Sequence, residues 1–183
     1  TPDDYLIRLH PTGGDNVNAN FFQHLHNVQF HGMGRSSGVA WGGAQSSTMK
    51  NVEVQNIAAG GTCVLVQNGT NSMTLEAVWC EARGRRGTTG FKVEAITSGV
   101  TFSGCKAESI DVGFDLERGD HYIIGAYFEN IGIPVIRRET TGNTHFLGLS
   151  VKNINYRETC DEDNNCTSSY YSEVDAAGNT IID

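Results

Sequence analysis

Proline is scarce in this chain of 183 residues, which contains 3 prolines but 22 glycines. Basic residues are also few: 13 lysines and arginines stand against 21 aspartates and glutamates, which leaves a formal net charge of −8. That balance gives no electrostatic support for binding nucleic acid. No apolar run reaches the roughly 18 residues of a membrane-spanning helix, so no membrane segment is expected. The abundant glycine suits a chain with many tight corners.

An initiator methionine and a signal peptide are also missing. We therefore expect the chain to be a processed product or a piece of a longer protein. Its length permits a single domain. No glycine-rich phosphate loop, nucleophile elbow or Cys–His pair is found, and no cofactor is predicted.

The chain contains a repeat. The seven-residue segment Leu75–Glu81, LEAVWCE, has counterparts of similar pattern at intervals of 23 to 26 residues, a period typical of stacked-repeat proteins. Its first position is large and apolar, its fourth is apolar or small, and its sixth is apolar or Cys. The six copies are Leu25–His31, Met49–Gln55, Leu75–Glu81, Val100–Lys106, Ile123–Glu129 and Phe146–Lys152.

This spacing predicts strands. The fourth and sixth positions point the same way on a strand, whereas helical spacing is not continued. Each copy is therefore predicted to be a strand of about seven residues. A second strand follows at Val39–Trp41, Val64–Val66, Phe91–Val93, Phe114–Leu116 and Pro134–Ile136. Two or three short strands per period predict an all-β fold, a right-handed parallel β-helix of about six coils. A leucine-rich-repeat solenoid is the nearest alternative, but its LxxLxLxxN pattern does not recur.

The seventh position predicts how the coils stack. In stacked coils its side chains form one outward column with neighbours about 4.8 Å apart. They are His31, Gln55, Glu81, Lys106, Glu129 and Lys152. Opposite charges alternate over the last four, which favours this register. The next residue is expected to turn a corner, because it is small or Asn: Gly32, Asn56, Ala82, Ala107, Asn130 and Asn153.

The repeat divides the chain into three parts. Residues 1–20 are expected to form an N-terminal strand, Tyr5–Leu9, and a loop. Residues 21–156 form the β-helix, and residues 157–183 a polar C-terminal cap or tail. No amphipathic capping helix precedes the first coil, so upstream sequence or another subunit is expected to cover it. Uncapped coils invite end-to-end stacking.

Five cysteines are present. Cys160 and Cys166 bracket an acidic, polar loop, and a disulfide between them is predicted. A metal site is the alternative, but no second cysteine pair and no nearby histidine supports it. In the alignment above, Cys80 and Cys105 occupy equivalent inward positions on neighbouring coils. They are either small buried hydrophobes or a bridged pair, and Cys63 is left over.

N-glycosylation sequons begin at Asn68 and Asn165. The second lies within the predicted disulfide loop. A sequon and a disulfide together are typical of the secretory route, so we expect a secreted, extracellular protein.

The stretch from Gly38 to Val52 reads GVAWGGAQSSTMKNV. It resembles the G-[IV]-x-W-x-x-A-Q-[AS]-[ST]-x-[LM]-x-N-[VI] stretch of pectate-lyase-superfamily β-helices. It looks most like the exo-β-1,3-glucanases of glycoside hydrolase family 55, with phage tail-spike depolymerases as more distant relatives. The matching residues are Trp41, Ala44, Gln45, Met49, Asn51 and Val52. The motif itself is expected to be structural and to join one coil to the next.

The resemblance implies a β-helical lobe that acts on a carbohydrate. The family has two such lobes, with a catalytic Glu in the second. This chain is shorter than one lobe, and none of its carboxylates matches that Glu, so no catalytic residue is carried over.

The outward fifth position suggests a binding surface. It reads Gln29, Glu53, Trp79, Gly104, Tyr127 and Ser150. Trp79 and Tyr127 are expected roughly 10 Å apart, with Gly104 leaving a gap of about two sugar units between them. Aromatic faces bind the apolar faces of sugars, so Trp79 and Tyr127, with Glu53 beside them, are predicted to bind a polysaccharide.

Glycoside hydrolysis needs two carboxylates about 5 to 10 Å apart. Glu81 and Glu129 are the candidate catalytic pair at the wider, inverting separation. Lys106 is expected between them, and such alternating charges also fit a solvated ladder without catalysis.

Two further clusters carry charge. His24, His26 and His31 lie within eight residues, but no carboxylate is close in sequence and no metal is predicted. The basic run Arg83–Gly87 is expected in a corner loop, where it could hold an acidic polysaccharide or a carboxylate partner, or be solvated.

Two classes of function fit these features. The first is an extracellular carbohydrate-active domain, β-glucanase-like or depolymerase-like, that binds a polysaccharide and cleaves it if the carboxylate pair acts. The alternative is a non-catalytic β-helix module of an extracellular fibre or filament, a homo-oligomer that assembles through uncapped ends.

Overall fold

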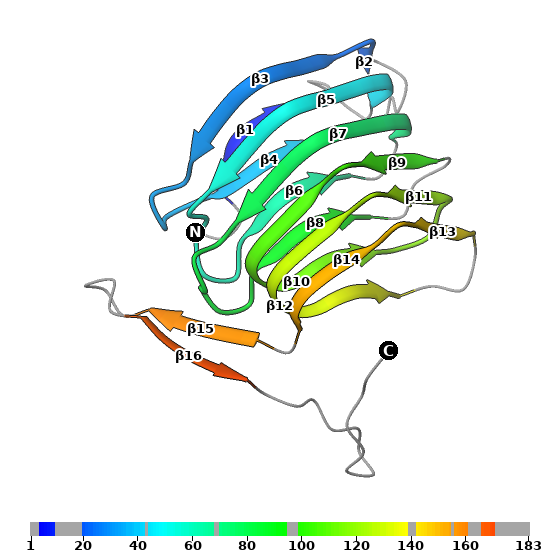
Figure 1. Ribbon diagram of the computed structural model, residues 1–183. Coiled ribbons are helices and arrows are strands. Elements are labelled where there is room, and N and C mark those ends of the chain that lie inside the picture. Colours follow the sequence, from blue (N-terminus) through cyan, green and yellow to red (C-terminus); the bar gives the residue numbers. More distant parts are fainter. Residues whose placement is uncertain are drawn as a thin grey trace.

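The computed structural model describes residues 4–9, 20–42, 44–67, 70–94, 99–138, 142–154, 156–160 and 166–170. Within these ranges the regular elements are strands (Figure 1), and none of the described residues forms a helix that could span a membrane. The strands are β1 (Tyr5–Leu9), β2 (Asn20–Phe21), β3 (His24–His31), β4 (Ser37–Trp41), β5 (Ala44–Gln55), β6 (Thr62–Val66), β7 (Asn71–Glu81), β8 (Thr89–Val93), β9 (Val100–Ser103), β10 (Lys106–Leu116), β11 (His121–Ile124), β12 (Tyr127–Arg137), β13 (Thr144–Leu147), β14 (Ser150–Ile154), β15 (Tyr156–Cys160) and β16 (Cys166–Tyr170).

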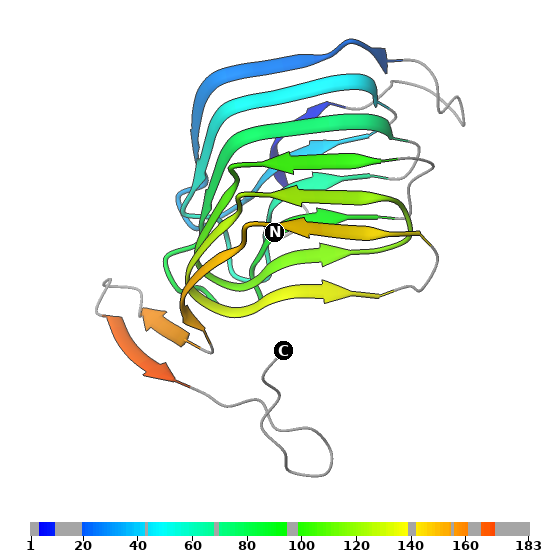
Figure 2. The ribbon, with the colours of Figure 1, turned by 45° about the vertical axis from the view of Figure 1, so that its right-hand side comes forward.

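Strands β1 to β14 form one parallel β-helix, which confirms the predicted fold class. Successive coils lie one below another (Figure 2). Each coil has three faces. Face A contains the first parts of β3, β5 and β7, followed by β9, β11 and β13. Face B contains the last parts of β3, β5 and β7, the first parts of β10 and β12, and β14. Face C contains β1, β4, β6, β8 and the last parts of β10 and β12.

The corner between faces A and B falls inside the repeat, at its third position. Ala77 there has a φ of 51°, and five other residues of the column also have positive φ. They are Asn27, Asn51, Gly104, Gly125 and Gly148. Gly and Asn adopt this left-handed conformation most readily. The corner explains why inward positions are the first, fourth and sixth instead of the first, third and fifth.

The corner between faces B and C follows the repeat, as predicted. Asn56, Asn130 and Asn153 have φ values of 53°, 53° and 57°. The amide Nδ2 of Asn153 donates to Oδ1 of Asn130 at 2.8 Å, so neighbouring coils are linked through these side chains. The expectation for Ala107 was wrong, because Ala107 is buried on face B and Ser109, with a φ of 52°, lies at the corner.

The core fills the interior of the coils. Its central column on face C is the predicted set of second strands, stacked in the register Val39, Val64, Phe91, Phe114 and Val135. Phe114 is fully buried and lies 4.8 Å, centroid to centroid, from both Phe91 and Phe102. Trp41 of the glucanase-like motif is also fully buried, which agrees with a structural role for that motif.

The predicted register was wrong by two residues in one coil. Leu75 lies beside Phe102, not Val100, and Trp79 lies beside Lys106. The fourth copy is therefore Phe102–Glu108. Val100 and Phe102 are both fully buried on the same strand. A slip of two residues leaves every side chain on its face, so the apolar pattern could not reveal it.

This correction separates Cys80 from Cys105. Cys80 lies beside Ala107 on the neighbouring coil, so the two cysteines are not at equivalent positions. Cys63, Cys80 and Cys105 are free, buried thiols. Because they are buried, the three act as small hydrophobes in the core, and burial raises the pKa of Cys105 to about 12.

The ends of the solenoid differ. Residues Tyr5–Leu9 form the predicted N-terminal strand, which pairs with β4 and extends face C. After the last coil, β15 and β16 form an antiparallel hairpin (Figure 1). Cys160 and Cys166 are opposite each other in its register. Their side chains lie outside the described part of the chain, so the disulfide stays a prediction.

Candidate functional site

Face B carries the residues predicted to bind carbohydrate. Because strands are paired in parallel, its outward side chains form two columns. The fifth-position column is Gln29, Glu53, Trp79, Lys106, Tyr127 and Ser150. The seventh-position column is His31, Gln55, Glu81, Glu108, Glu129 and Lys152.

The predicted gap between Trp79 and Tyr127 does not exist. Gly104 lies at the corner between faces A and B with a φ of 60°, and Lys106 stands between the two rings. Its Nζ is 4.6 Å from the centroid of the Trp79 ring and 5.4 Å from that of Tyr127. Both rings are partly exposed. The result is a continuous aromatic–cation–aromatic surface, held by cation–π attraction.

The predicted alternation of charge beside this surface was also wrong. Glu81, Glu108 and Glu129 occupy three consecutive rungs, about 4.8 Å apart. Lys106 reaches this column from the side, with Nζ 2.6 Å from Glu108 Oε2 and 3.9 Å from Glu129 Oε2. Mutual repulsion of three carboxylates is thereby reduced by a cation they share.

The two candidate catalytic carboxylates have different surroundings. Partial burial raises the pKa of Glu81; Glu108 and Glu53 raise it further, and Arg83 at 3.7 Å partly opposes the rise. The pKa of Glu129 is lowered, first by the hydrogen bond from Lys152 Nζ at 2.6 Å and then by that from the Tyr127 hydroxyl at 3.0 Å. Glu81 is thus the carboxyl better suited to hold a proton and Glu129 the one held ionised, the difference that acid–base pairs require.

Glu53 lies next to Trp79 across the coils, as the alignment predicted. It is partly buried, and its Oε1 accepts a hydrogen bond from Gln55 Nε2 on the same strand. This contact directs Glu53 along the strand beside the indole ring. The structure therefore places all three predicted binding residues on one face.

The remaining charged clusters have structural contacts. His24 Nδ1 and His26 Nε2 both lie within hydrogen-bond distance of the Thr48 hydroxyl, at 2.6 and 2.9 Å. In the basic run, Arg85 Nη1 donates to the side-chain oxygen of Asn56 and, at 3.4 Å, to the carbonyl of Ile57. Arg85 thus joins its corner loop to the preceding coil.

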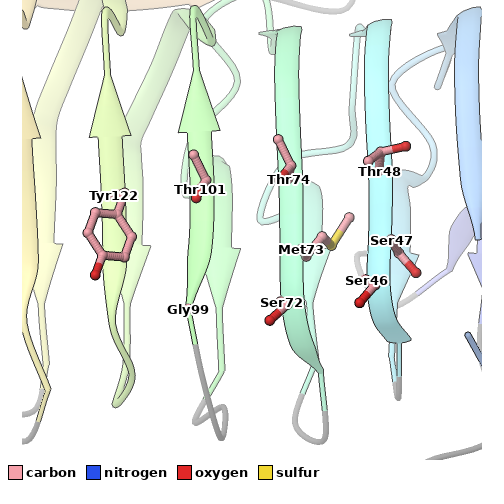
Figure 3. Close-up of a pocket in the computed structure, with 9 residues that line it drawn as sticks. All are labelled: Ser46, Ser47, Thr48, Ser72, Met73, Thr74, Gly99, Thr101 and Tyr122. Atoms are coloured by element: carbon pink, nitrogen blue, oxygen red, sulfur yellow. The ribbon is translucent and has the colours of Figure 1, made fainter. Parts of the chain in front are cut away.

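Sequence reasoning missed a second concave surface, a groove of about 380 Å³ on face A (Figure 3). Its column of outward side chains runs Thr48, Thr74, Thr101 and Tyr122 across four coils. Ser46 and Ser72 line the same groove. The recurrence of Thr one position before the inward apolar residue was the available signal.

Asn68 and Asn165 lie outside the described residues, so both glycosylation sites stay predictions.

Comparison of the chain with protein-family models, curated proteins and solved structures found no match. The β-helix is thus established by the structure, and the glucanase and tail-spike resemblances stay predictions.

Proposed function

We propose that this protein is a secreted, carbohydrate-active β-helix that binds a polysaccharide along face B. The observation that carries the proposal is the surface formed by Trp79, Lys106 and Tyr127. Two partly exposed rings on a rigid sheet offer flat apolar contacts to sugar faces, and Lys106 supplies a donor between them for hydroxyl or carboxylate groups. The three lie on consecutive coils, so their spacing is set by backbone pairing.

The neighbouring carboxylates support cleavage of the bound chain. Glu81 and Glu129 are two rungs apart on the ladder, with Glu108 on the rung between them. Two rungs span roughly 10 Å, the upper limit of the separation in inverting glycosidases, which hold a water molecule between base and sugar. Glu81, with its raised pKa, protonates the leaving oxygen. Glu129, with its lowered pKa, accepts the proton of the attacking water. Hydrolysis then falls as pH rises through the pKa of Glu81 and as it drops through that of Glu129.

Binding is tested with laminarin, a β-1,3-glucan, and with an acidic polysaccharide, by calorimetry. The Trp79→Ala and Tyr127→Ala variants should each weaken binding of the preferred glycan, and the double variant should weaken it most. Met33→Ala is the matched control, because Met33 is 71% exposed in the turn that follows β3 and belongs to neither outward column of face B. Unchanged affinity in the double variant would contradict the proposal.

Cleavage is tested separately by release of reducing ends. Glu81→Gln and Glu129→Gln should each abolish release while leaving glycan affinity within about twofold, because both keep the shape of the side chain. If neither changes the rate, the carboxylate pair is not catalytic, and if the unaltered protein releases nothing, the protein is a binding module only.

A second candidate function is a structural module that stacks end to end. On the last coil, the inward positions Phe146, Leu149 and Val151 are 46%, 39% and 43% exposed, whereas Ile123, Ala126 and Phe128 of the preceding coil are at most 1% exposed. A further coil from a second copy would cover these side chains and pair β14. Sedimentation velocity should then show concentration-dependent elongation that Leu149→Glu abolishes; a strictly monomeric species would exclude this function.

A further inference from the structure

The groove on face A has a chemistry unlike that of face B. None of its lining side chains bears a formal charge. Apart from Met73 and Gly99, the lining residues carry hydroxyl groups: Ser46, Ser47, Thr48, Ser72, Thr74, Thr101 and Tyr122. In Figure 3 the hydroxyl-bearing side chains of β5, β7 and β9 follow one another toward the ring of Tyr122 on β11. Such a surface offers many hydrogen-bond donors and acceptors together with one exposed aromatic ring, that of Tyr122.

The ionisable side chains beside the groove are engaged by neighbouring side chains. In the next outward column of face A, Lys50 Nζ lies 2.8 Å from Glu76 Oε1. At the far end of the threonine column, Thr48 is engaged by the imidazoles of His24 and His26. The groove is therefore bounded by a paired salt bridge and a hydrogen-bonded histidine pair, and at its Tyr122 end the Asp120 carboxylate accepts hydrogen bonds from Asn143.

At the aromatic end of the groove, the Tyr122 ring is held by a stacking contact and its edge stays uncovered. The Tyr122 ring stacks on His145 of the following coil, with centroids 4.8 Å apart and planes 8° from parallel. Tyr122 remains 42% exposed. Beside it, Gly99 has no side chain; a Cβ built there would lie 3.5 Å from Tyr122 Cε2. The glycine thus leaves room against the edge of the ring.

From these features we infer that face A carries a second binding site, specific for an uncharged oligosaccharide chain. The bound oligosaccharide lies along the solenoid axis, with one sugar ring against Tyr122. Hydroxyl groups of the oligosaccharide form hydrogen bonds with Thr101, Thr74 and Thr48. The column from Thr48 to Thr101 spans two rungs, roughly 10 Å, which is the length of about two sugar units. This site lies on a different face from Trp79 and Tyr127 and does not rest on the proposed function.

The inference separates two faces by ligand charge. Face B combines one lysine with three glutamates, so a substrate bound there contacts charged side chains. The groove on face A is lined by hydroxyl groups and by no charged side chain, so a uronic acid would lose its hydration there without gaining a cation. We expect neutral oligosaccharides to bind face A and acidic ones to avoid it.

The test uses three neutral probes, cellohexaose, laminarihexaose and maltohexaose, and the acidic probe hexagalacturonic acid, with the full chain and calorimetric titration. At least one neutral hexaose should bind. For that probe, Tyr122→Ala should weaken affinity about twofold to tenfold, the loss expected for one ring contact, and Tyr122→Phe should retain most of it. Gly99→Leu, which fills the space beside the ring without requiring a left-handed backbone, should also weaken it.

The control is Met33→Ala in the turn that follows β3, where the side chain is 71% exposed; it should leave binding of the neutral hexaose within about twofold. Far-ultraviolet circular dichroism of each variant confirms that the solenoid is intact. Failure of all three neutral probes to bind overturns the inference. So does a loss of binding in Trp79→Ala with full affinity in Tyr122→Ala and Gly99→Leu, since that would place all carbohydrate on face B.

Discussion

Lys106→Met removes the cation on which the corrected geometry of face B depends. The Lys106 side chain is 30% exposed. It lies over the Trp79 ring at 4.6 Å and is within 2.6 Å of Glu108 and 3.9 Å of Glu129. A partly exposed cation–π contact contributes about 0.5–1 kcal/mol, and each ion pair about 0.2–1 kcal/mol. One ammonium makes all these contacts, so their contributions overlap.

We therefore expect Lys106→Met to lower the free energy of unfolding by about 1–2 kcal/mol. Equilibrium urea unfolding at pH 7, followed by tryptophan fluorescence, measures the change. Methionine keeps the length and most of the apolar contact of lysine, so loss of packing is small.

Lys50→Met is the matched control. Lys50 forms a single exposed ion pair with Glu76, in which the two side chains are 45% and 48% exposed. Its replacement should cost less than about 0.5 kcal/mol. A double-mutant cycle between Lys106→Met and Trp79→Leu should show a coupling of about 0.5–1 kcal/mol. Equal effects of the two lysine replacements, with no coupling to Trp79, would refute the described surface.

The other predictions concern the core and pH. Phe114→Ala should lower the free energy of urea unfolding by about 3–5 kcal/mol, because Phe114 is fully buried among three other rings. Phe146→Ala on the last coil, where Phe146 is 46% exposed, should lower it by less than about 1 kcal/mol. Similar losses at both sites would contradict the described core. His121 is 1% exposed, and its pKa is lowered by burial and by Arg137 although the Glu117 carbonyl and Asp120 oppose this. The unfolded chain therefore takes up a proton at a higher pH than the folded chain. Stability should fall as pH drops through the ordinary pKa of about 6.5, by at most about 1.4 kcal/mol per pH unit. Thermal unfolding between pH 7.5 and 5 measures this slope, which should be reduced in His121→Gln and would be unchanged if His121 were not responsible.

The coil period and the buried faces were predictable from the sequence. Apolar side chains at fixed spacing, such as Leu75, Val78 and Cys80, point into the core. Their recurrence predicts the stacking of coils, which the structure shows at intervals of 21 to 27 residues. The column from Val39 to Val135 on face C was likewise found correctly. These features are determined by hydrophobic burial, which the sequence shows directly.

The exact lateral neighbours were not predictable in the same way. Two coils differ in length by six residues, since Phe102 follows Leu75 by 27 positions and Ile123 follows Phe102 by 21. Val100 and Phe102 are equally suited to the core, so the choice between them depends on where Gly104 makes its turn. That choice moved Lys106 from the carboxylate column to a position between Trp79 and Tyr127.

Disulfide cross-linking between coils tests this stacking register most directly. Glu76 and Ser103 are paired neighbours on face A, with Cα atoms about 4.8 Å apart, within the range that a disulfide spans. Thr101 is two residues away from that pairing, at roughly 8 Å from Glu76, which is too far. We predict that Glu76→Cys combined with Ser103→Cys cross-links under mild oxidation, as detected by peptide mass spectrometry, while Glu76→Cys combined with Thr101→Cys does not. The opposite result would restore the register of the simple sequence alignment and remove Lys106 from between the two rings.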